Sequence, residues 1–452
     1  MPLCAPSAWS DPLYSIRLFR MYRTLAFNLI LAALSLIPVG LLLAQEKQEP
    51  MSIDQLAAQA LATNPEIKFY ESEIAAAEAG RRVAGKLRNP ELDLEIGQKR
   101  TSGGDFSAEG LAYAVSVAQP IEWPGRIGLR KAIANGDIQL ALLGLERFKT
   151  RLSSEIRSLA FRLSTAQDKA AIAEEVSNRF NAVKDVLVQR ETGGVTPLLE
   201  LRAIDAASVV MEKAAFEAAI EMQKALLELN QLMGRRADTP LVVMRAEYDF
   251  PETPSIGELM TKALVNNYRM HIRRAELAQQ GLRVSLAKHE RYPTISVGPY
   301  YSQAKAGESE REAGIGLSLE LPIFRNGKAS IAQEQSRRQQ AQATMQATAR
   351  ELEREVATAA LVYKNSRKRL QTWSLERIQS LQEATELADR HYRLGAVPVA
   401  TYIELQQNYV EALEAINEVK AEALEAGLEL EQLIGTSQSL VKSESESTSK
   451  PE

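Results

Sequence analysis

Hydrophobic and small residues recur at a coiled-coil period in the first half of the chain. Between Pro124 and Pro197 no proline occurs, and the segment is rich in strong helix formers. Its apolar or small residues follow at steps of four and three, close to a 3.5-residue period. They are Leu152, Ile156, Leu159, Leu163, Ala166, Ala170, Ala173, Val176, Phe180, Val183 and Leu187. We expect a helix at about 125–190, roughly 100 Å long at 1.5 Å per residue, and a shorter returning helix at about 198–233.

The second half of the chain has the same pattern. No proline occurs between Pro322 and Pro398, and an apolar seam again has coiled-coil spacing. The seam breaks at Arg377 and then resumes. We expect a long helix at about 327–393 and a returning helix at about 399–434.

Before each long helix, the hydrophobic period changes to two, which is typical of one-sided strands. Leu92, Leu94 and Ile96, for example, alternate with acidic residues and glycine. The four expected strands are at about 91–100, 110–120, 293–303 and 313–322. Two polar, glycine-containing segments, 101–109 and 305–312, are expected to be the loops that join each pair.

These elements belong to a duplicated unit of about 200 residues. Ile53–Asn64 is similar to Ile256–Asn267 at an offset of 203 residues, and Gly194–Pro197 is similar to Gly395–Pro398 at an offset of 201. Such a unit is longer than the repeats of about 20–50 residues that build solenoids. The predicted organisation is a signal peptide at 1–44, a first repeat at 45–247, a second repeat at 248–435 and a disordered, Ser- and Glu-rich tail at 436–452.

The N-terminus resembles a secretory signal. Arg17, Arg20 and Arg23 precede an apolar run at 25–44, after which the chain is polar. A basic region, an apolar region and a small residue at the boundary are typical of a cleaved signal peptide. The alternative is an uncleaved anchor, because about 20 residues suffice to cross a bilayer. Met21 is a second possible start.

The strand pattern changes what the composition indicates. The mean hydropathy of -0.21 and the 45% hydrophobic content are those of a soluble protein. One-sided strands of about ten residues with no sheet to pack on nevertheless fit a transmembrane β-barrel. About eight strands are the minimum for a closed barrel, so several chains would have to contribute. The alternative is a soluble β-hairpin domain. The net charge of -4 and the absence of a basic block give no indication of nucleic-acid binding.

Several motifs occur in a characteristic order. They are Asn64-Pro65-Glu66, Asn89-Pro90-Glu91-Leu92, Gln119-Pro120-Ile121-Glu122-Trp123-Pro124-Gly125-Arg126, Leu321-Pro322-Ile323-Phe324 and Asn326-Gly327-Lys328. Together they resemble the TolC-type outer membrane efflux proteins, over about 52–435. The resemblance implies a mostly α fold with a transmembrane β portion. In it, long coiled-coil helices and four β-strands per chain trimerise into a β-barrel that an α-helical barrel continues. The turn at 123–126 is similar, more weakly, to the heavy-metal CzcC-like branch.

The resemblance also implies a function. A homotrimer in the outer membrane lipid of a Gram-negative-type cell would extend through the periplasm. It would be a passive exit duct for small molecules or metal ions, working with a periplasmic adaptor and an inner-membrane pump. The helical corners would meet the adaptor. These corner residues are Gly193, Gly194, Val195, Thr196, Pro197, Gly395, Ala396, Val397 and Pro398.

Four polar residues are candidates for the duct itself. The resemblance places Thr401 and Glu404 at the periplasmic aperture, where three copies of Glu404 would attract cations. Alternatively, Glu404 lies on an ordinary solvated helix face. Asp93 and Glu95 are candidates for the barrel lumen, and the alternative is that they are exposed strand charges.

No residue pattern indicates catalysis. The sequence has no Gly-rich phosphate loop and no nucleophile elbow, and its three histidines lack ligand spacing. Four methionines spaced by eleven residues, Met211, Met222, Met233 and Met244, are attributed to core packing. We therefore expect no enzyme activity, cofactor or metal site. The alternative function from a different class is a soluble periplasmic coiled-coil scaffold or adaptor without a pore.

Overall fold

The computed structural model describes residues 50–103, 106–189, 195–244, 248–320, 327–373, 375–435 and 442–443. The chain forms two units, Met1–Glu49 and Pro50–Glu452, and all described residues belong to the second. The predicted signal peptide at 1–44 lies outside the described residues. Across the described ranges, the helices include none with the length and apolar character of a membrane span.

Helices dominate the second unit, in agreement with the expected fold class. The helices are α2 (Ile53–Thr63), α3 (Pro65–Ala84), α4 (Arg126–Gln189), α5 (Val195–Leu232), α6 (Ile256–Asn266), α7 (Tyr268–His289), α8 (Lys328–Thr372), α9 (Leu375–Arg393) and α10 (Val399–Ile434). The strands are β1 (Glu91–Gly103), β2 (Phe106–Ile121), β3 (Tyr248–Asp249), β4 (Ile295–Ala306), β5 (Glu308–Leu319) and β6 (Lys442–Ser443). Each repeat thus has two short helices, a strand pair and a long helical hairpin.

One long helix is interrupted. A continuous helix at 327–393 was expected, but α8 ends at Thr372 and α9 begins at Leu375. Trp373 leaves the helical conformation, with φ -95° and ψ 73°, while its N–H still donates to the carbonyl of Arg369. The interruption lies close to the break of the apolar seam at Arg377. Long helices depend on tertiary packing of an apolar face, so the helix is least supported where the seam fails.

The hairpins are longer than predicted. The polar segments expected as loops continue the strands, and the β4–β5 turn is confined to Gly307, whose φ of 88° suits glycine. Antiparallel pairing satisfies backbone donors and acceptors whatever the side chains are, so polarity alone did not end these strands.

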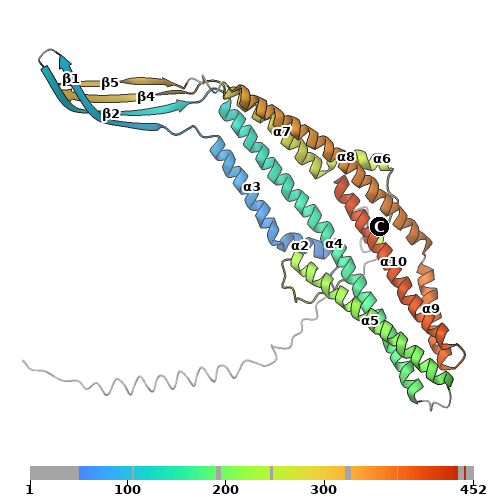
Figure 1. Cartoon of the computed structure of the whole chain (residues 1–452). Coiled ribbons are helices and arrows are strands. Elements are labelled where there is room, and N and C mark those ends of the chain that lie inside the picture. Colours follow the sequence, from blue (N-terminus) through green and yellow to red (C-terminus); the bar gives the residue numbers. More distant parts are fainter. Residues whose placement is uncertain are drawn as a thin grey trace, which may run out of the picture. The chain divides into compact units, whose positions relative to one another are not determined.

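The strands β1, β2, β4 and β5 form one antiparallel sheet in that order, with β1 and β5 as free edges (Figure 1). Directly opposed residues share a face of the sheet. Leu94 opposes Val115, Val115 opposes Tyr301, and Val297 opposes Leu317. Most large apolar residues of the four strands therefore share one face, which toward the hairpin turns also carries Arg100, Glu109 and Arg311. The opposite face is mostly small and polar.

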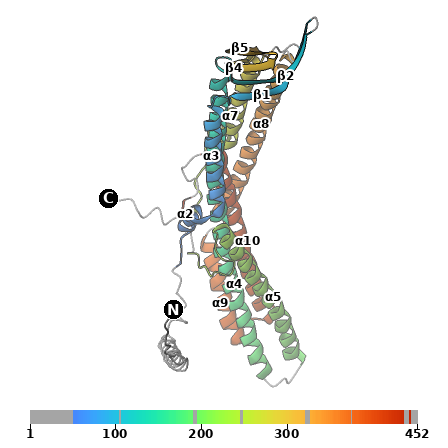
Figure 2. The ribbon, with the colours of Figure 1, turned by 90° about the vertical axis from the view of Figure 1, so that its left-hand side faces the viewer.

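The helices form a layer in which each contacts its lateral neighbours. Next to the sheet the order is α3, α4, α7 and α8 (Figure 1). Beyond the short helices, the contacts give the order α5, α4, α10 and then α8 with α9. Figure 2 shows the unit from the side, with α5 and α9 toward the end away from the sheet. One lateral edge of the unit consists of β1, α3 and α5, and the opposite edge consists of β5, α8 and α9.

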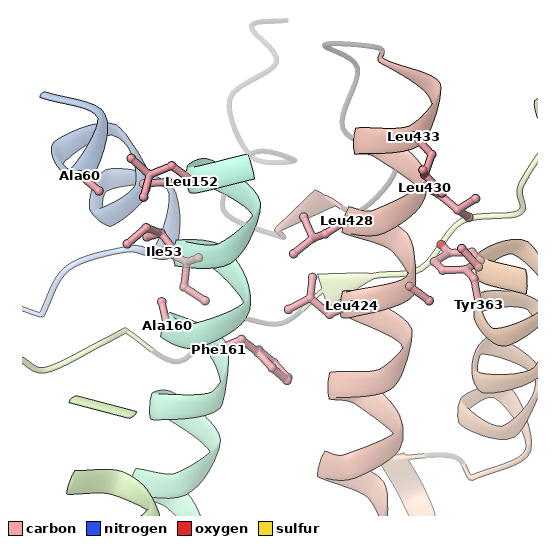
Figure 3. Packing of buried hydrophobic residues seen from close by; sticks show 14 of the residues in the cluster. Ile53, Ala60, Leu152, Ala160, Phe161, Tyr363, Leu424, Leu428, Leu430 and Leu433 are labelled. Atoms are coloured by element: carbon pink, nitrogen blue, oxygen red, sulfur yellow. The ribbon is translucent and has the colours of Figure 1, made fainter. Parts of the chain in front are cut away.

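The largest hydrophobic core lies where the short helices meet the long ones. Ile53 of α2, Leu152 of α4, Tyr363 of α8 and Leu430 of α10 are buried there (Figure 3). Near it, β3 from the linker between the repeats pairs with β6 from the C-terminal segment. Lys442 and Ser443 are thus in a strand, which differs from the disorder predicted for 436–452; the rest of that tail lies outside the described residues.

Candidate functional site

The corner between α9 and α10 is a tight turn with a left-handed glycine. Gly395 has a φ of 75°. Its N–H donates to the carbonyl of Tyr392, and the N–H of Ala396 donates to the carbonyl of His391, both at 2.9 Å. Pro398 then provides the N-cap of α10 with a φ of -63°. Such caps satisfy the last carbonyls of a helix, so the corner holds a defined conformation.

The other corner is described only in part. Gly193 and Gly194 lie outside the described residues. Val195, Thr196 and Pro197 form the start of α5.

A buried tyrosine fixes the corner to its neighbours. Tyr402 is fully buried, stacks on Tyr392 with ring centroids 4.9 Å apart, and meets the ring of Phe180 from α4 edge-on at 5.6 Å. Its hydroxyl donates to Oδ1 of Asp389 at 3.2 Å, and Asp389 also accepts from Arg393 at 3.0 Å. Burial and, next, the Asp389 carboxylate raise the pKa of Tyr402. The phenol therefore stays protonated and remains a donor.

Thr401 and Glu404 lie on the opposite, exposed side of the same helical turn. Their spacing of three residues places them on one helix face. The structure thus brings the two predicted aperture residues together, close to the corner and beside the fixed Tyr402.

The exposed face of α10 carries further carboxylates that the sequence reasoning missed. Glu411 and Glu418 follow Glu404 at intervals of seven and are also exposed. Residues seven apart stay within about 20° of one line on a helix. Other glutamates of α10 point to α4, where Glu414 pairs with Lys169 at 2.7 Å and Glu425 pairs with Arg162. The seven-residue spacing was the signal that could have revealed the acidic line.

Asp93 and Glu95 lie on the polar face of the sheet, since they oppose Ser116 and Ala114. Both are exposed. Glu310 of β5 lies on the same polar face and pairs with Lys99 of β1. Carboxylates therefore gather on the polar face of the sheet, away from its apolar face.

An aromatic stack and the hydrogen bonds of a buried arginine hold the junction between the sheet and the helices. Trp123 stacks on Tyr292 with centroids 4.6 Å apart and planes at 11°. The buried Arg126 donates to the carbonyl of His289 at 3.0 Å and to Oγ1 of Thr294 at 3.3 Å. Trp123 thus packs within the chain.

Among the described residues, no group of three or more His, Cys, Asp or Glu side chains could hold a metal ion. Of the eleven-spaced methionines, Met211 and Met233 are buried, whereas Met244 is about half exposed. Helix packing accounts for the buried ones.

Comparisons with solved structures identify the fold. The outer-membrane channel OprN superposes with a TM-score of 0.68 at 18% identity, covering 85% of this chain and 89% of that chain. CmeC from Campylobacter jejuni gives 0.65 at 16% identity, covering 87% and 90%. The open state of MtrE from Neisseria gonorrhoeae gives 0.68 at 14% identity, covering 85% and 88%. The chain thus has the fold of these TolC-like channels.

The comparison with family models identifies the family, although no individual curated protein is similar enough to match. No curated protein matches the chain. The family model described as outer membrane efflux protein matches residues 56–235 and 259–436, one match in each repeat. These two matches include the strands, the helical hairpins and the acidic face of α10. The chain therefore belongs to the outer membrane efflux protein family.

Proposed function

We propose that the chain is one subunit of a homotrimeric exit duct that crosses the outer membrane and continues through the periplasm. Small molecules or metal ions pass through it passively, and an inner-membrane pump drives them through a periplasmic adaptor. The observation that carries this proposal is a four-stranded sheet with an apolar face next to the helices and two edges that are unpaired within the described residues.

The apolar face suits lipid. Ile96 is 81% exposed and Ile315 is 79% exposed, and their neighbours on the same face are exposed as well. Removing such surface from water is favourable by about 25 cal/mol per Å². Free strand edges, by contrast, are not tolerated in hydrocarbon. Joining β5 of one copy to β1 of the next removes every free edge once the ring closes, and three copies provide twelve strands.

The helical layer supplies the periplasmic part of the duct. Its free lateral edges continue those of the sheet, so the same association closes the helices into a tube. The corners at Gly193–Pro197 and Gly395–Pro398 then form the tips that meet the adaptor. Thr401 and Glu404 form the periplasmic aperture, and Asp93 and Glu95 line the barrel lumen.

The charge of the duct favours cations. A threefold axis brings three copies of Glu404 together, with Glu411 and Glu418 continuing the acidic line above them. Rings of carboxylates attract cations in channels. Metal ions or cationic small molecules are therefore the substrate class that this lining supports.

The experiment starts from the full chain, extracted from outer membranes into mild detergent. Light scattering is expected to give the mass of three subunits, and planar bilayers are expected to show cation-selective conductance. Release from washed membranes without detergent, or a monomer in mild detergent, would contradict the duct and favour the soluble scaffold.

A further inference from the structure

We propose that Phe216 of one copy seats in the hollow beside the α8–α9 break of the next copy, and that charge complementarity fixes this contact. The proposal rests on the trimeric duct proposed above and names the residues that join its subunits. Four observations support it: a second apolar stripe on α5, a hollow at the end of α8, the packing of the equivalent helices α10 and α4 inside the chain, and the opposite charges of the two surfaces.

Helix α5 has two seams, and only one of them is buried by the part of the chain that the structure describes. Ile204, Met211, Ala218, Ala225 and Leu229 are buried, mostly against α4. A second set, Val209, Phe216, Ile220 and Leu227, has heptad spacing and is exposed. Positions five residues apart, such as Ile204 and Val209, lie about 140° apart around a helix. A helix with two seams in these directions is expected to have a neighbour on each side.

The receiving surface lies on the opposite lateral edge. An open hollow of about 480 Å³ is lined by Asn365, Lys368, Arg369, Thr372 and Trp373 at the end of α8. The hollow lies at the C-terminal end of α8, beside the interruption before α9.

The duplication provides a template for how the two edges meet. By the repeat, α5 is equivalent to α10 and α8–α9 is equivalent to α4. Inside the chain α10 packs on α4, and Glu414 binds Lys169 while Glu425 binds Arg162. The equivalent contact between copies places α5 against α8.

The template also sets the level of Phe216. Phe216 corresponds to Asn417, 201 residues later, which lies between Glu414 and Glu425. Asn417 therefore lies at the level of the stretch of α4 from Arg162 to Lys169. With the offset of 202 residues found at Ile121 and Ile323, the equivalent stretch of α8 is 364–371. That stretch lines the hollow.

Charge and chemistry agree with this pairing. From residue 211 to residue 228, α5 carries four glutamates and two lysines, whereas 356–373 carries four basic residues and no acidic one. Phe216 is 67% exposed. A phenyl ring among Lys368 and Arg369 would also gain cation–π contacts. The second copy thus fits the hollow by level and charge.

Cysteine pairing tests the contact. In a Cys4→Ser background, which removes the chain's single cysteine, Phe216→Cys is combined with Lys368→Cys and oxidised in mild detergent. A covalent ladder of two and three subunits is expected, because a disulfide forms only when the Cα atoms lie within about 7 Å. The matched control combines Val210→Cys, an exposed residue off the second seam, with Lys368→Cys, and should stay monomeric on denaturing gels.

The outcomes separate the two proposals. A trimer in mild detergent that yields no covalent ladder, or a ladder of equal strength in the Val210 control, would overturn the seating of Phe216 and leave the duct intact. A monomer in mild detergent would overturn both. A covalent dimer from Phe216→Cys alone would indicate a contact between equivalent α5 faces and would also overturn the proposal.

Discussion

The side-chain amide of Asn64 donates to the backbone carbonyl of Leu232 at 2.8 Å, and Asn267 makes the same bond to Leu433 at 2.8 Å. Each asparagine is also an N-cap, since its Oδ1 accepts from the backbone N–H two residues later. One side chain therefore starts a short helix and ties down the end of a long one, in both repeats.

Replacing Asn267 by alanine is expected to destabilise the fold. Losing an N-cap typically costs about 1 kcal/mol, and the buried carbonyl of Leu433 would lose its donor at a further cost of about 1 kcal/mol. Thermal unfolding of Asn267→Ala and Asn64→Ala, followed by circular dichroism in detergent, should show similar losses. Asn408→Ala, at an exposed position of α10, is the control; an equal loss there would contradict the role of the caps.

Tyr402→Phe is expected to loosen the corner without removing its packing. The phenyl ring keeps the contacts with Tyr392 and Phe180, but Asp389 loses a donor, which costs about 1 kcal/mol. Hydrogen exchange of the backbone amides around Gly395 should become faster. Exchange in the sheet should stay unchanged, and an unaltered rate at the corner would show that the Tyr402 hydroxyl does not hold it.

Glu404→Gln is expected to lower the preference of the duct for cations. The change removes three negative charges at the aperture while keeping the side-chain size. The reversal potential in a salt gradient should shift toward zero, and adding Glu411→Gln and Glu418→Gln should shift it further. Glu78→Gln, on the exposed face of α3, is the control. An unchanged reversal potential in the triple variant would place these carboxylates outside the conduction path.

Stability is expected to depend on pH through Glu429. The side chain of Glu429 is exposed as a whole, but partial desolvation of its carboxyl group and, next, the neighbouring Glu355 raise its pKa above the ordinary value of 4.5. A raised carboxyl pKa favours the folded state while the group is protonated. This contribution is complete below pH 4.5 and is lost as the pH rises through the raised pKa. Glu429→Gln should therefore gain stability over the unmodified chain at pH 7 but not at pH 4. Equal gains at both values would contradict the assignment, and Glu418→Gln serves as the exposed control.

Hydrophobic periodicity predicted the long helices and the strands, because each repeats one spacing over many residues. The 3.5-residue seam at Leu152–Leu187 is buried along α4, and the alternation from Leu92 to Ile96 agrees with a single apolar sheet face. The short helices α2 and α6 were not predicted, although Ser52 and Gln55 form a capping box that could have marked the first of them. Eleven residues give too few turns for a clear period. The interruption at Trp373 was not predicted, although the apolar seam breaks close to it, at Arg377.

The candidate site was predictable in its turn chemistry but not in its contacts. The Gly395–Pro398 corner follows from residues that end and start helices. The bond between Tyr402 and Asp389 depends on how α9 and α10 rotate against each other, and no spacing within one helix reports that rotation.

The junction between β2 and β4 has a consequence for the subunit boundary in the sheet. It joins the last strand of one repeat to the first strand of the next, and Val115 opposes Tyr301 there. In the proposed trimer, the same step between molecules would join β5 to β1, and the repeat offsets of 202 and 203 would make Leu317 and Gln98 the equivalent pair. Three copies would then present six like units around one axis. The wall of such a barrel would have quasi-sixfold symmetry. Its strand boundaries would be of two kinds, within one chain at β2–β4 and between chains at β5–β1, and both would share one hydrogen-bond register.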